Sequence, residues 1–284
     1  MAPTAPPSLS VSVATTVPIC PPNAARKQIV TSRLVLRPVG QPDLSPLHRL
    51  RSQPEVMRWT KLGIVDNSLE ATQQKLDPFL PPNDLTTYNF AICLRRQDRE
   101  GHETTQERSG ENLVLRDDDY DDEHDVSGEF IGIGGCYQWG LGPGENTLLG
   151  WPGLGYMIRK EHWGKGYGSE FMEGFLSAWR ELPRQEIVRT VDESSVFPVS
   201  DDCKAADKDD DDVQVGSTTA QIKAKEQLCA LTEHTNFVSV RLLQKNGFTK
   251  AKEWKDKNHH PGGTDDVTLV AWLWDSSAPP YQET

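Results

Sequence analysis

Apolar and polar residues alternate in several short segments of the N-terminal half, which is the two-residue period of a strand with one buried face. In the first segment Leu34 and Leu36 alternate with small or charged neighbours, and Pro38 ends the pattern. Residues 86–96 are rich in strand-forming residues, and residues 128–139 alternate apolar residues with glycine. We expect these two to be neighbouring strands joined by a long insert. The three predicted strands cover residues 29–39, 86–96 and 128–139.

Helical spacing of apolar residues follows between and after these strands. Leucines at near-helical intervals after Asp43, a candidate N-cap, predict a short helix. A second helix is expected to begin after Ser68 and to stop at Pro78. The longest pattern starts at Ser169, where one apolar face is formed by Phe171, Phe175, Trp179 and Leu182.

The C-terminal part of the chain predicts a strand, a helix and a hairpin. Residues 226–234 (EQLCALTEH) are typical of a strand. Residues 235–248 predict a helix that has Thr235 and Asn236 as cap residues and ends at Gly247. The last two strands are separated by a turn with adjacent glycines, which favours a hairpin.

Composition adds boundaries to this pattern. No apolar run approaches the roughly 18 residues of a membrane span, so we expect no membrane partner. The first 28 residues are rich in Pro, Ala, Ser and Thr and lack the basic start and apolar block of a secretory signal. We predict a disordered tail over residues 1–28, one domain over residues 29–276 and a second tail over residues 277–284.

Two acidic runs account for the net charge of −12. Residues 117–125 contain seven acids and no Lys or Arg, and residues 201–212 contain seven acids and two lysines. The rest of the chain is balanced and has no basic surface, so we expect no nucleic-acid partner. Because like charges repel, we predict disordered acidic inserts at about 97–127 and 183–225.

Five scattered cysteines without a CxxC pair indicate reduced thiols, and we expect a cytoplasmic protein. The seven histidines show no HExxH motif or other paired spacing, so we predict no metal site. His259 and His260 lie in a turn rich in glycine and proline, and we expect them to be solvated.

The candidate chemistry lies between the predicted strand LGYMI (154–158) and the long helix. Gly164, Gly166 and Gly168 connect the two. A strand that runs through glycines into a helix directs backbone N–H groups and the positive end of the helix dipole at one point, which favours phosphate binding. A P-loop is excluded because glycine follows Lys165, and a dinucleotide-binding fingerprint is weak because the spacing is GxGxG.

Residues 155–171 (GYMIRKEHWGKGYGSEF) resemble the acetyl-CoA-binding motif of the GCN5-related N-acetyltransferases (GNAT), Q/R-x-x-G-x-G-x-G/A. Gly166 and Gly168 fill the glycine positions, and Trp163 replaces the usual Gln or Arg. That replacement, together with an early SRLVLRP segment, is typical of the ribosomal-protein alanine acetyltransferase-like branch. NFVSVRLLQKNGF (236–248) is similar to the second motif of this branch and meets all its fixed positions.

The resemblance implies an α+β fold with a central, mixed, mostly antiparallel twisted sheet that is flanked by helices. The sheet is expected to splay between its fourth and fifth strands, LGYMI and QLCAL, to admit acetyl-CoA, the implied cofactor. The implied acceptor is the primary amine of a small molecule or a protein N-terminus, and the enzyme is a monomer or homodimer. Expected cofactor contacts are Met157, Ile158, Arg159, Trp163, Gly164, Lys165, Gly166, Tyr167, Gly168, Ser169, Asn236, Ser239 and Lys245.

The resemblance also indicates catalytic residues. Ser239 matches a position where the branch places a hydroxyl near the thiol, so we expect it to be the proton donor. The backbone N–H of Met157 or of its neighbour would stabilise the oxyanion. The usual glutamate before the fourth strand is Gly153 here, which leaves the general base open. The alternatives are Glu129, Glu145 and a water chain past Tyr156.

Two aromatic residues lie near the predicted site in the sequence or are expected to line it, His162 and Trp59. We expect His162 to be a surface residue beside the glycine loop, and Trp59 to face the acceptor. The missing glutamate and the large inserts leave a second hypothesis, a catalytically weak CoA-binding regulatory or interaction protein.

Overall fold

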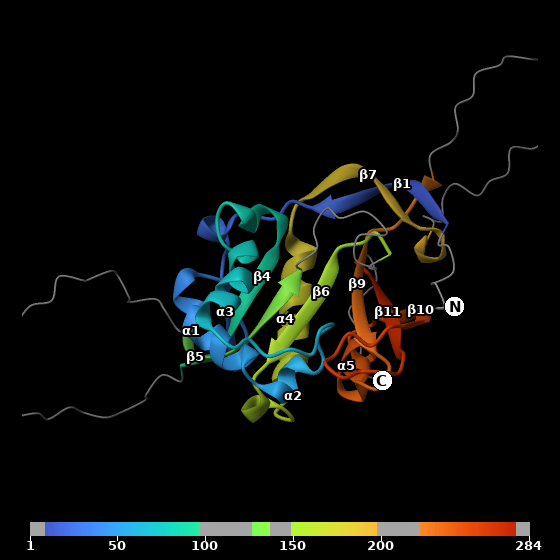
Figure 1. The fold of residues 1–284 in the computed structure, drawn as a ribbon. Coiled ribbons are helices and arrows are strands. Elements are labelled where there is room, and N and C mark those ends of the chain that lie inside the picture. Colours follow the sequence, from blue (N-terminus) through green and yellow to red (C-terminus); the bar gives the residue numbers. More distant parts are fainter. Residues whose placement is uncertain (1–8, 97–126, 137–148, 198–221, 277–284) are drawn as a thin grey trace, which may run out of the picture.

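The computed structural model describes residues 9–96, 127–136, 149–197 and 222–276. Its main sheet has eight strands in the order β2–β3–β4–β5–β6–β9–β11–β10, and neighbours are antiparallel except for β6 and β9. The predicted mixed, mostly antiparallel sheet is therefore confirmed (Figure 1). The strands are β2 (Ile29–Val30), β3 (Leu34–Pro38), β4 (Tyr88–Arg95), β5 (Ser127–Cys136), β6 (Gly153–Ile158), β9 (Gln227–Glu233), β10 (Thr249–Asp256) and β11 (Val267–Asp275).

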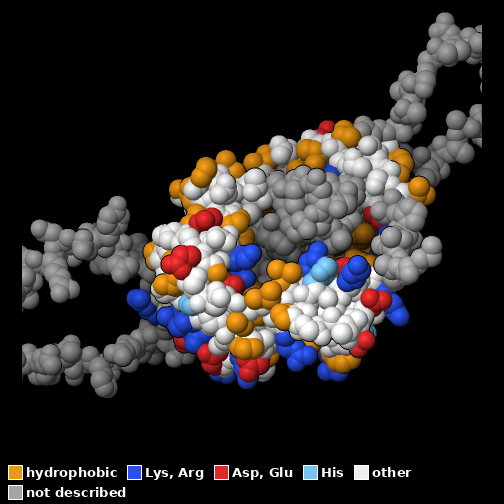
Figure 2. Space-filling view, in the orientation of Figure 1, with side chains coloured by type: hydrophobic (Ala, Val, Ile, Leu, Met, Phe, Trp, Pro, Cys, Tyr) orange, Lys and Arg blue, Asp and Glu red, His pale blue; other side chains and the backbone are white. Residues whose placement is uncertain are grey.

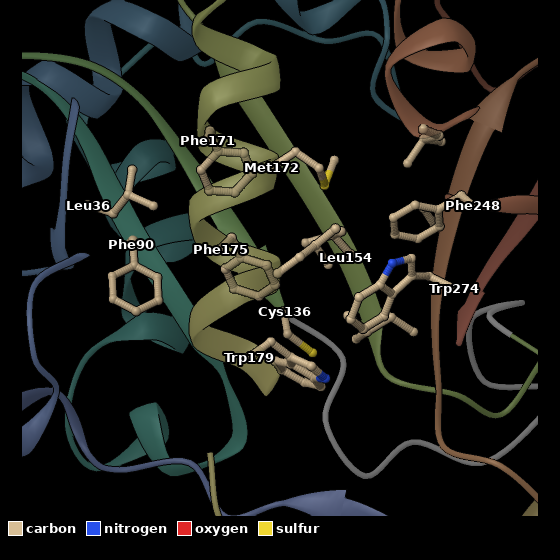
Figure 3. Packing of buried hydrophobic residues seen from close by; sticks show 14 of the residues in the cluster. Leu36, Phe90, Cys136, Leu154, Phe171, Met172, Phe175, Trp179, Phe248 and Trp274 are labelled. Atoms are coloured by element: carbon tan, nitrogen blue, oxygen red, sulfur yellow. The ribbon is translucent and has the colours of Figure 1, made fainter. Parts of the chain in front are cut away.

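One face of the sheet, called here the cofactor face, is covered by α4 (Tyr167–Glu181) and α5 (Phe237–Lys245). The aromatic side chains of α4 lie against Leu36, Phe90 and Leu154 of the sheet, and Trp274 extends the same core to β11 (Figure 3). Of the predicted apolar face of α4, three aromatic residues are fully buried and the fourth position is partly buried. Each buried aromatic contributes about 1.5–3 kcal/mol through removal of apolar surface from water.

The opposite face, called the acceptor face, carries α1 (Leu44–Arg51), α2 (Pro54–Met57) and α3 (Leu69–Leu76) over its N-terminal half. The predicted cap of α3 is confirmed, because Ser68 accepts a hydrogen bond from the Ala71 backbone. The predicted cap of α1 is wrong. Asp43 makes no side-chain cap bond and instead binds Arg37 through both oxygens, at 2.6 and 2.9 Å.

Part of the expected N-terminal tail is a strand. β1 (Ser10–Pro18) pairs antiparallel over its whole length with β7 (Arg184–Asp192), and β8 (Ile222–Lys223) joins it to form a second, three-stranded sheet. The prediction of disorder is therefore wrong for β1, and β7 and β8 lie in the stretch predicted to be an insert. Both acidic runs, residues 1–8 and residues 277–284 lie outside the described residues.

The small sheet forms because Ser10–Pro18 alternates valine with small polar residues. Val13 is fully buried and packs with Val191 of β7. The same cluster contains Cys229, Ala271 and Leu273, so the small sheet covers the C-terminal half of the acceptor face. The N-terminal extension is thereby part of the domain core.

The main sheet splits between β6 and β9. These parallel strands pair through only two residues each, Gly153 with Cys229 and Leu154 with Ala230. Beyond them the strands diverge toward their carboxyl ends (Figure 1). The predicted split between LGYMI and QLCAL is confirmed, and α4 and α5 begin shortly after the two diverging strand ends.

Candidate functional site

The N-terminus of α4 is an anion-binding arrangement. The helix begins at Tyr167, and its N-cap, Gly166, has no side chain to cap it. The first helical bond runs from Glu170 N to Gly166 O, so the helix offers no acceptor to the N–H groups of Tyr167, Gly168 and Ser169. These three groups lie at the positive end of the helix dipole, and a phosphate fits there.

Two glycines give this loop its course. Gly164 and Gly166 have φ of +71° and +82°, the left-handed region that costs other residues about 1–2 kcal/mol. A Cβ on Gly164 would meet nothing within 4 Å, whereas a Cβ on Gly166 would lie 3.2 Å from Nη2 of Arg33. The loop is open at Gly164 and tight at Gly166, and the exposed Lys165 between them can face an anion from the solvent side.

Arg33 and Glu170 fix the loop, and the sequence analysis missed both. Arg33 donates to Lys165 O at 2.9 Å and to Glu170 Oε2 at 2.7 Å. Burial of the Glu170 carboxyl works to raise its pKa, but hydrogen bonds from Thr31, Ser32 and Arg33 outweigh burial and lower the pKa. A negative charge in the first turn of α4 would repel a phosphate, and the paired Arg33 offsets it.

Trp163 joins the loop to the end of β6. Its Nε1–H donates to Ile158 O at 2.7 Å. Trp163 therefore takes up the last carbonyl of the strand, and its half-exposed ring is the part that can contact a ligand. This bond is the contact that Trp163 makes at the motif position usually held by Gln or Arg.

The edge of β6 exposes alternate backbone groups to the split. Arg159 N donates to Ile131 O of β5, and the alternation of an antiparallel ladder turns Met157 N–H toward β5 as well. The N–H groups of Tyr156 and Ile158 then face the split. Met157 N–H is thus unsuited to the oxyanion role, and its neighbour Tyr156 has the required direction.

Tyr156 and Ser239 meet across the split. Their hydroxyl oxygens lie 3.1 Å apart and share a hydrogen bond between β6 and α5. Burial raises the pKa of the Tyr156 phenol, against the smaller opposing effect of the bond to Ser239. The phenol is therefore protonated at neutral pH, so the pair can donate a proton. The structure brings these two predicted catalytic residues together.

Gly168 and Asn236 place this pair. A Cβ on Gly168 would lie 3.3 Å from Leu242 of α5 and 4.0 Å from the Tyr156 ring, so glycine permits the close approach of α4. Asn236 caps α5, with Oδ1 accepting from Ser239 N at 3.2 Å. The Asn236 side-chain oxygen thus orients the backbone of Ser239.

Glu129 lies far from the hydroxyl pair. Its carboxylate binds Arg159 at 2.8 Å and lies 3.6 Å from Nε2 of His162. Tyr156 is opposite Gly134, five positions along β5 from Glu129, which is about 17 Å at 3.4 Å per residue. The structure therefore does not support Glu129 as the general base. His162 is 9% exposed, so its prediction as a surface residue is wrong.

Glu233, which the sequence analysis did not consider, lies at the end of β9 on the acceptor face. Thr232, the preceding residue, faces the opposite side and accepts a hydrogen bond from Trp272 of the main core. Continuing the β6–β9 register places Glu233 across the split from Met157, whose side chain also packs on the acceptor face. One carboxylate oxygen accepts a hydrogen bond from Thr235.

The remaining predicted residues lie around the split. Trp59 follows α2, is 36% exposed and stacks with Arg58, whose guanidinium is 4.6 Å from the ring centroid. Lys245 is in the last turn of α5. Glu145 lies outside the described residues. Apolar, Lys and Arg side chains lie near the centre of the face shown in Figure 2.

Two classes of site are absent from the part of the chain that the structure describes. No three His, Cys, Asp or Glu residues there are grouped as metal ligands. None of the described helices has the length and apolar character to cross a membrane.

Comparison with known proteins agrees with this geometry. Residues 33–249 match the family model described as the acetyltransferase (GNAT) domain. An acetyltransferase of the GNAT family from Bacillus anthracis has a similar structure, with a TM-score of 0.50, 14% identity and coverage of 89% of this chain and 100% of its own. RimL, a ribosomal L7/L12 alpha-N-protein acetyltransferase in complex with coenzyme A, has a TM-score of 0.50 and 13% identity. The match covers 88% of this chain and 100% of RimL. No curated protein sequence matches significantly. The chain, matched over most of its length and carrying a split sheet with a glycine loop, belongs to the GNAT acetyltransferase family.

Proposed function

We propose that the protein transfers the acetyl group of acetyl-CoA to a primary amine. The observation that carries the proposal is one continuous path, from the uncapped N-terminus of α4, along the free edge of β6, to the Tyr156–Ser239 pair. The N–H groups at 167–169 would hold the diphosphate, and the backbone of Tyr156 and Ile158 would hold the pantetheine arm. Acetyl-CoA, when bound, supplies the thioester.

The residues divide the proton transfers between two faces of the sheet. Tyr156 N–H stabilises the charge that forms on the carbonyl oxygen. On the cofactor face, Ser239 donates a proton to the departing sulfur, and Tyr156 supports that hydroxyl. On the acceptor face, the Glu233 carboxylate accepts the proton that the amine loses, directly or through a water. The nitrogen–carbon bond replaces the carbon–sulfur bond, and free thiol is released.

The acceptor is a small amine or the N-terminus of a protein. RimL is named as an enzyme of the second kind, so a peptide with a free N-terminus belongs in the acceptor panel beside small amines. None of the four cysteines that the structure describes forms a disulfide, consistent with action in a reducing compartment such as the cytoplasm. We propose that the enzyme acts as a monomer or a homodimer.

Thiol release in the presence of acetyl-CoA and a panel of amines tests the function. We expect amine-dependent release, and Glu233→Gln should lower kcat about 100-fold because it removes the proton acceptor. Glu129→Gln is the matched control and should leave kcat within about threefold, the size of an ordinary charge change at a partly exposed ion pair. Coenzyme A binding by calorimetry without thiol release would favour the catalytically weak alternative.

A further inference from the structure

Two loops from opposite halves of the sheet meet at the open end of the split. One follows α2 and contains Thr60 and Gly63, and the other is the turn between β10 and β11 (Figure 1). Nε2 of His260 in that turn donates to Thr60 O at 2.9 Å, although the residues are 200 positions apart. We call this contact the His260 bridge. His260 was expected to be solvated, and the structure makes it a contact between the halves.

In the bridge, the His260 ring packs directly against the backbone of Gly63. Gly63 has a φ of +62°, and a Cβ there would lie 2.6 Å from the imidazole ring carbons of His260. Thr60 is held by its own bond to Met57 O at 2.7 Å. On the other side, His260 N donates to Asn258 Oδ1 at 3.0 Å. Both loops are thus internally ordered where they meet, and the ring occupies space that only a glycine at 63 leaves open.

Neighbouring contacts place the bridge over the two diverging strand ends. On one side, Gln53 at the start of α2 accepts from Lys160 N at 2.9 Å and donates to Glu161 at 2.8 Å, just beyond β6. On the other side, β11 carries the turn and pairs Leu269 with Glu233 at the end of β9. The bridge therefore spans the open end of the split on the side of α2, which is the acceptor face.

This placement bounds the path of the acceptor. Since α4 and α5 occupy the cofactor face, the amine has to reach the split from the acceptor face. There the small sheet covers the C-terminal half, the helices α1–α3 cover the N-terminal half, and the bridge crosses the open end between them. The Glu233 carboxylate lies at the same strand ends and would attract a cationic ammonium group.

We propose that the His260 bridge determines acceptor size, so that the enzyme selects primary ammonium groups on slender, unbranched chains and rejects amines branched next to the nitrogen. The inference rests on the proposed function. An unbranched chain needs less room beside the imidazole than an amine branched at the carbon next to the nitrogen, because each added methyl group widens the chain at the bridge. Discrimination by one or two methyl groups in such a site amounts to roughly 10–200-fold in kcat/KM.

The test compares kcat/KM for an unbranched alkylamine and for an amine branched at the adjacent carbon, by thiol release. His260→Ala should raise the branched-to-unbranched ratio about tenfold, and Gly63→Ala should do the same because its Cβ displaces the ring. His259→Ala, an exposed neighbour in the same turn, is the matched control and should leave the ratio unchanged. Calorimetry with coenzyme A confirms that each variant is folded.

The outcomes separate this inference from the function on which it rests. An unchanged ratio in both His260→Ala and Gly63→Ala, with thiol release retained, overturns the bridge alone. Equal increases in His259→Ala also overturn it, because the effect would then belong to the turn in general. A wild-type protein that binds coenzyme A but releases no thiol with any amine overturns the proposed function instead.

Discussion

Replacing Tyr156 with Phe removes one hydroxyl and tests whether the Tyr156–Ser239 pair moves a proton. The ring should stay in place, because its centroid lies 5.9 Å from that of Phe171 in the core. Only the 3.1 Å bond to Ser239 is lost, which costs about 0.5–1.5 kcal/mol of unfolding free energy. A pair that merely holds α5 against β6 would leave the rate near the wild-type value. If Tyr156 supports proton donation by Ser239, loss of its hydroxyl should lower kcat about 100-fold.

A double-mutant cycle with Ser239→Ala sharpens this prediction. Since residues that act as one unit are not additive, the double variant should be slower than the slower single variant by no more than about threefold. The assay is thiol release at saturating acetyl-CoA and amine, with KM measured for both. Tyr88→Phe, a buried tyrosine of β4, controls for loss of a hydroxyl elsewhere in the core. If the fold losses in kcat of the two single variants multiply in the double variant, or if Tyr156→Phe keeps the wild-type kcat, a joint role is refuted.

Three further variants test the loop, the ion pair beneath it and the N-terminal strand. Gly166→Ala should weaken coenzyme A binding in calorimetry about tenfold, because it adds strain at φ +82° and a contact with Arg33. Gly164→Ala should weaken binding less, because a Cβ there meets no neighbour. Equal losses of affinity in the two variants would contradict this difference. Glu170→Gln should flatten the fall of Tm below pH about 4.5. The lowered pKa stabilises the fold above that pH, and this contribution is lost as the pH falls through the folded-state value; parallel Tm curves would refute it. Val13→Asp should reduce the unfolding free energy in urea by about 3 kcal/mol, with exposed Ser12→Asp as control, and an unchanged midpoint would place β1 outside the core.

Most of the fold could be predicted because the patterns were local. The apolar face of α4, the cap at Ser68 and the turn into α4 through Gly166 each depend on residues within a few positions of one another. β1 was missed for the opposite reason. Its valines alternate as a strand requires, but its partner β7 is more than 160 residues away and lies beside an acidic run. Composition favoured disorder there, and tertiary pairing decided otherwise.

The part of the site that is formed by the local backbone could be predicted from the sequence. The ion pairs between residues that are distant in the sequence could not. The anion site follows from glycines before a helix. Arg33 and Glu170 could not be found in this way, since their contact joins a strand start to a helix start 137 residues later. The prediction of Glu129 as a possible base failed for the same reason, because the position of a glutamate on a strand does not show which ion pairs its carboxylate makes. Glu129 is engaged by Arg159.

In the proposed mechanism, the two faces of the split separate the proton donor from the proton acceptor. At the vertex, Gly153 pairs with Cys229, so this position lies where the two strands are still joined. We propose that the base of this enzyme lies where the strands have separated and on the face that the amine approaches. Glu233 of β9 meets both conditions, whereas Tyr156 and Ser239 occupy the other face. With the proposed carboxylate on β9, acid and base still lie on opposite faces of the sheet, because Glu233 is on the acceptor face and the Tyr156–Ser239 pair is on the cofactor face.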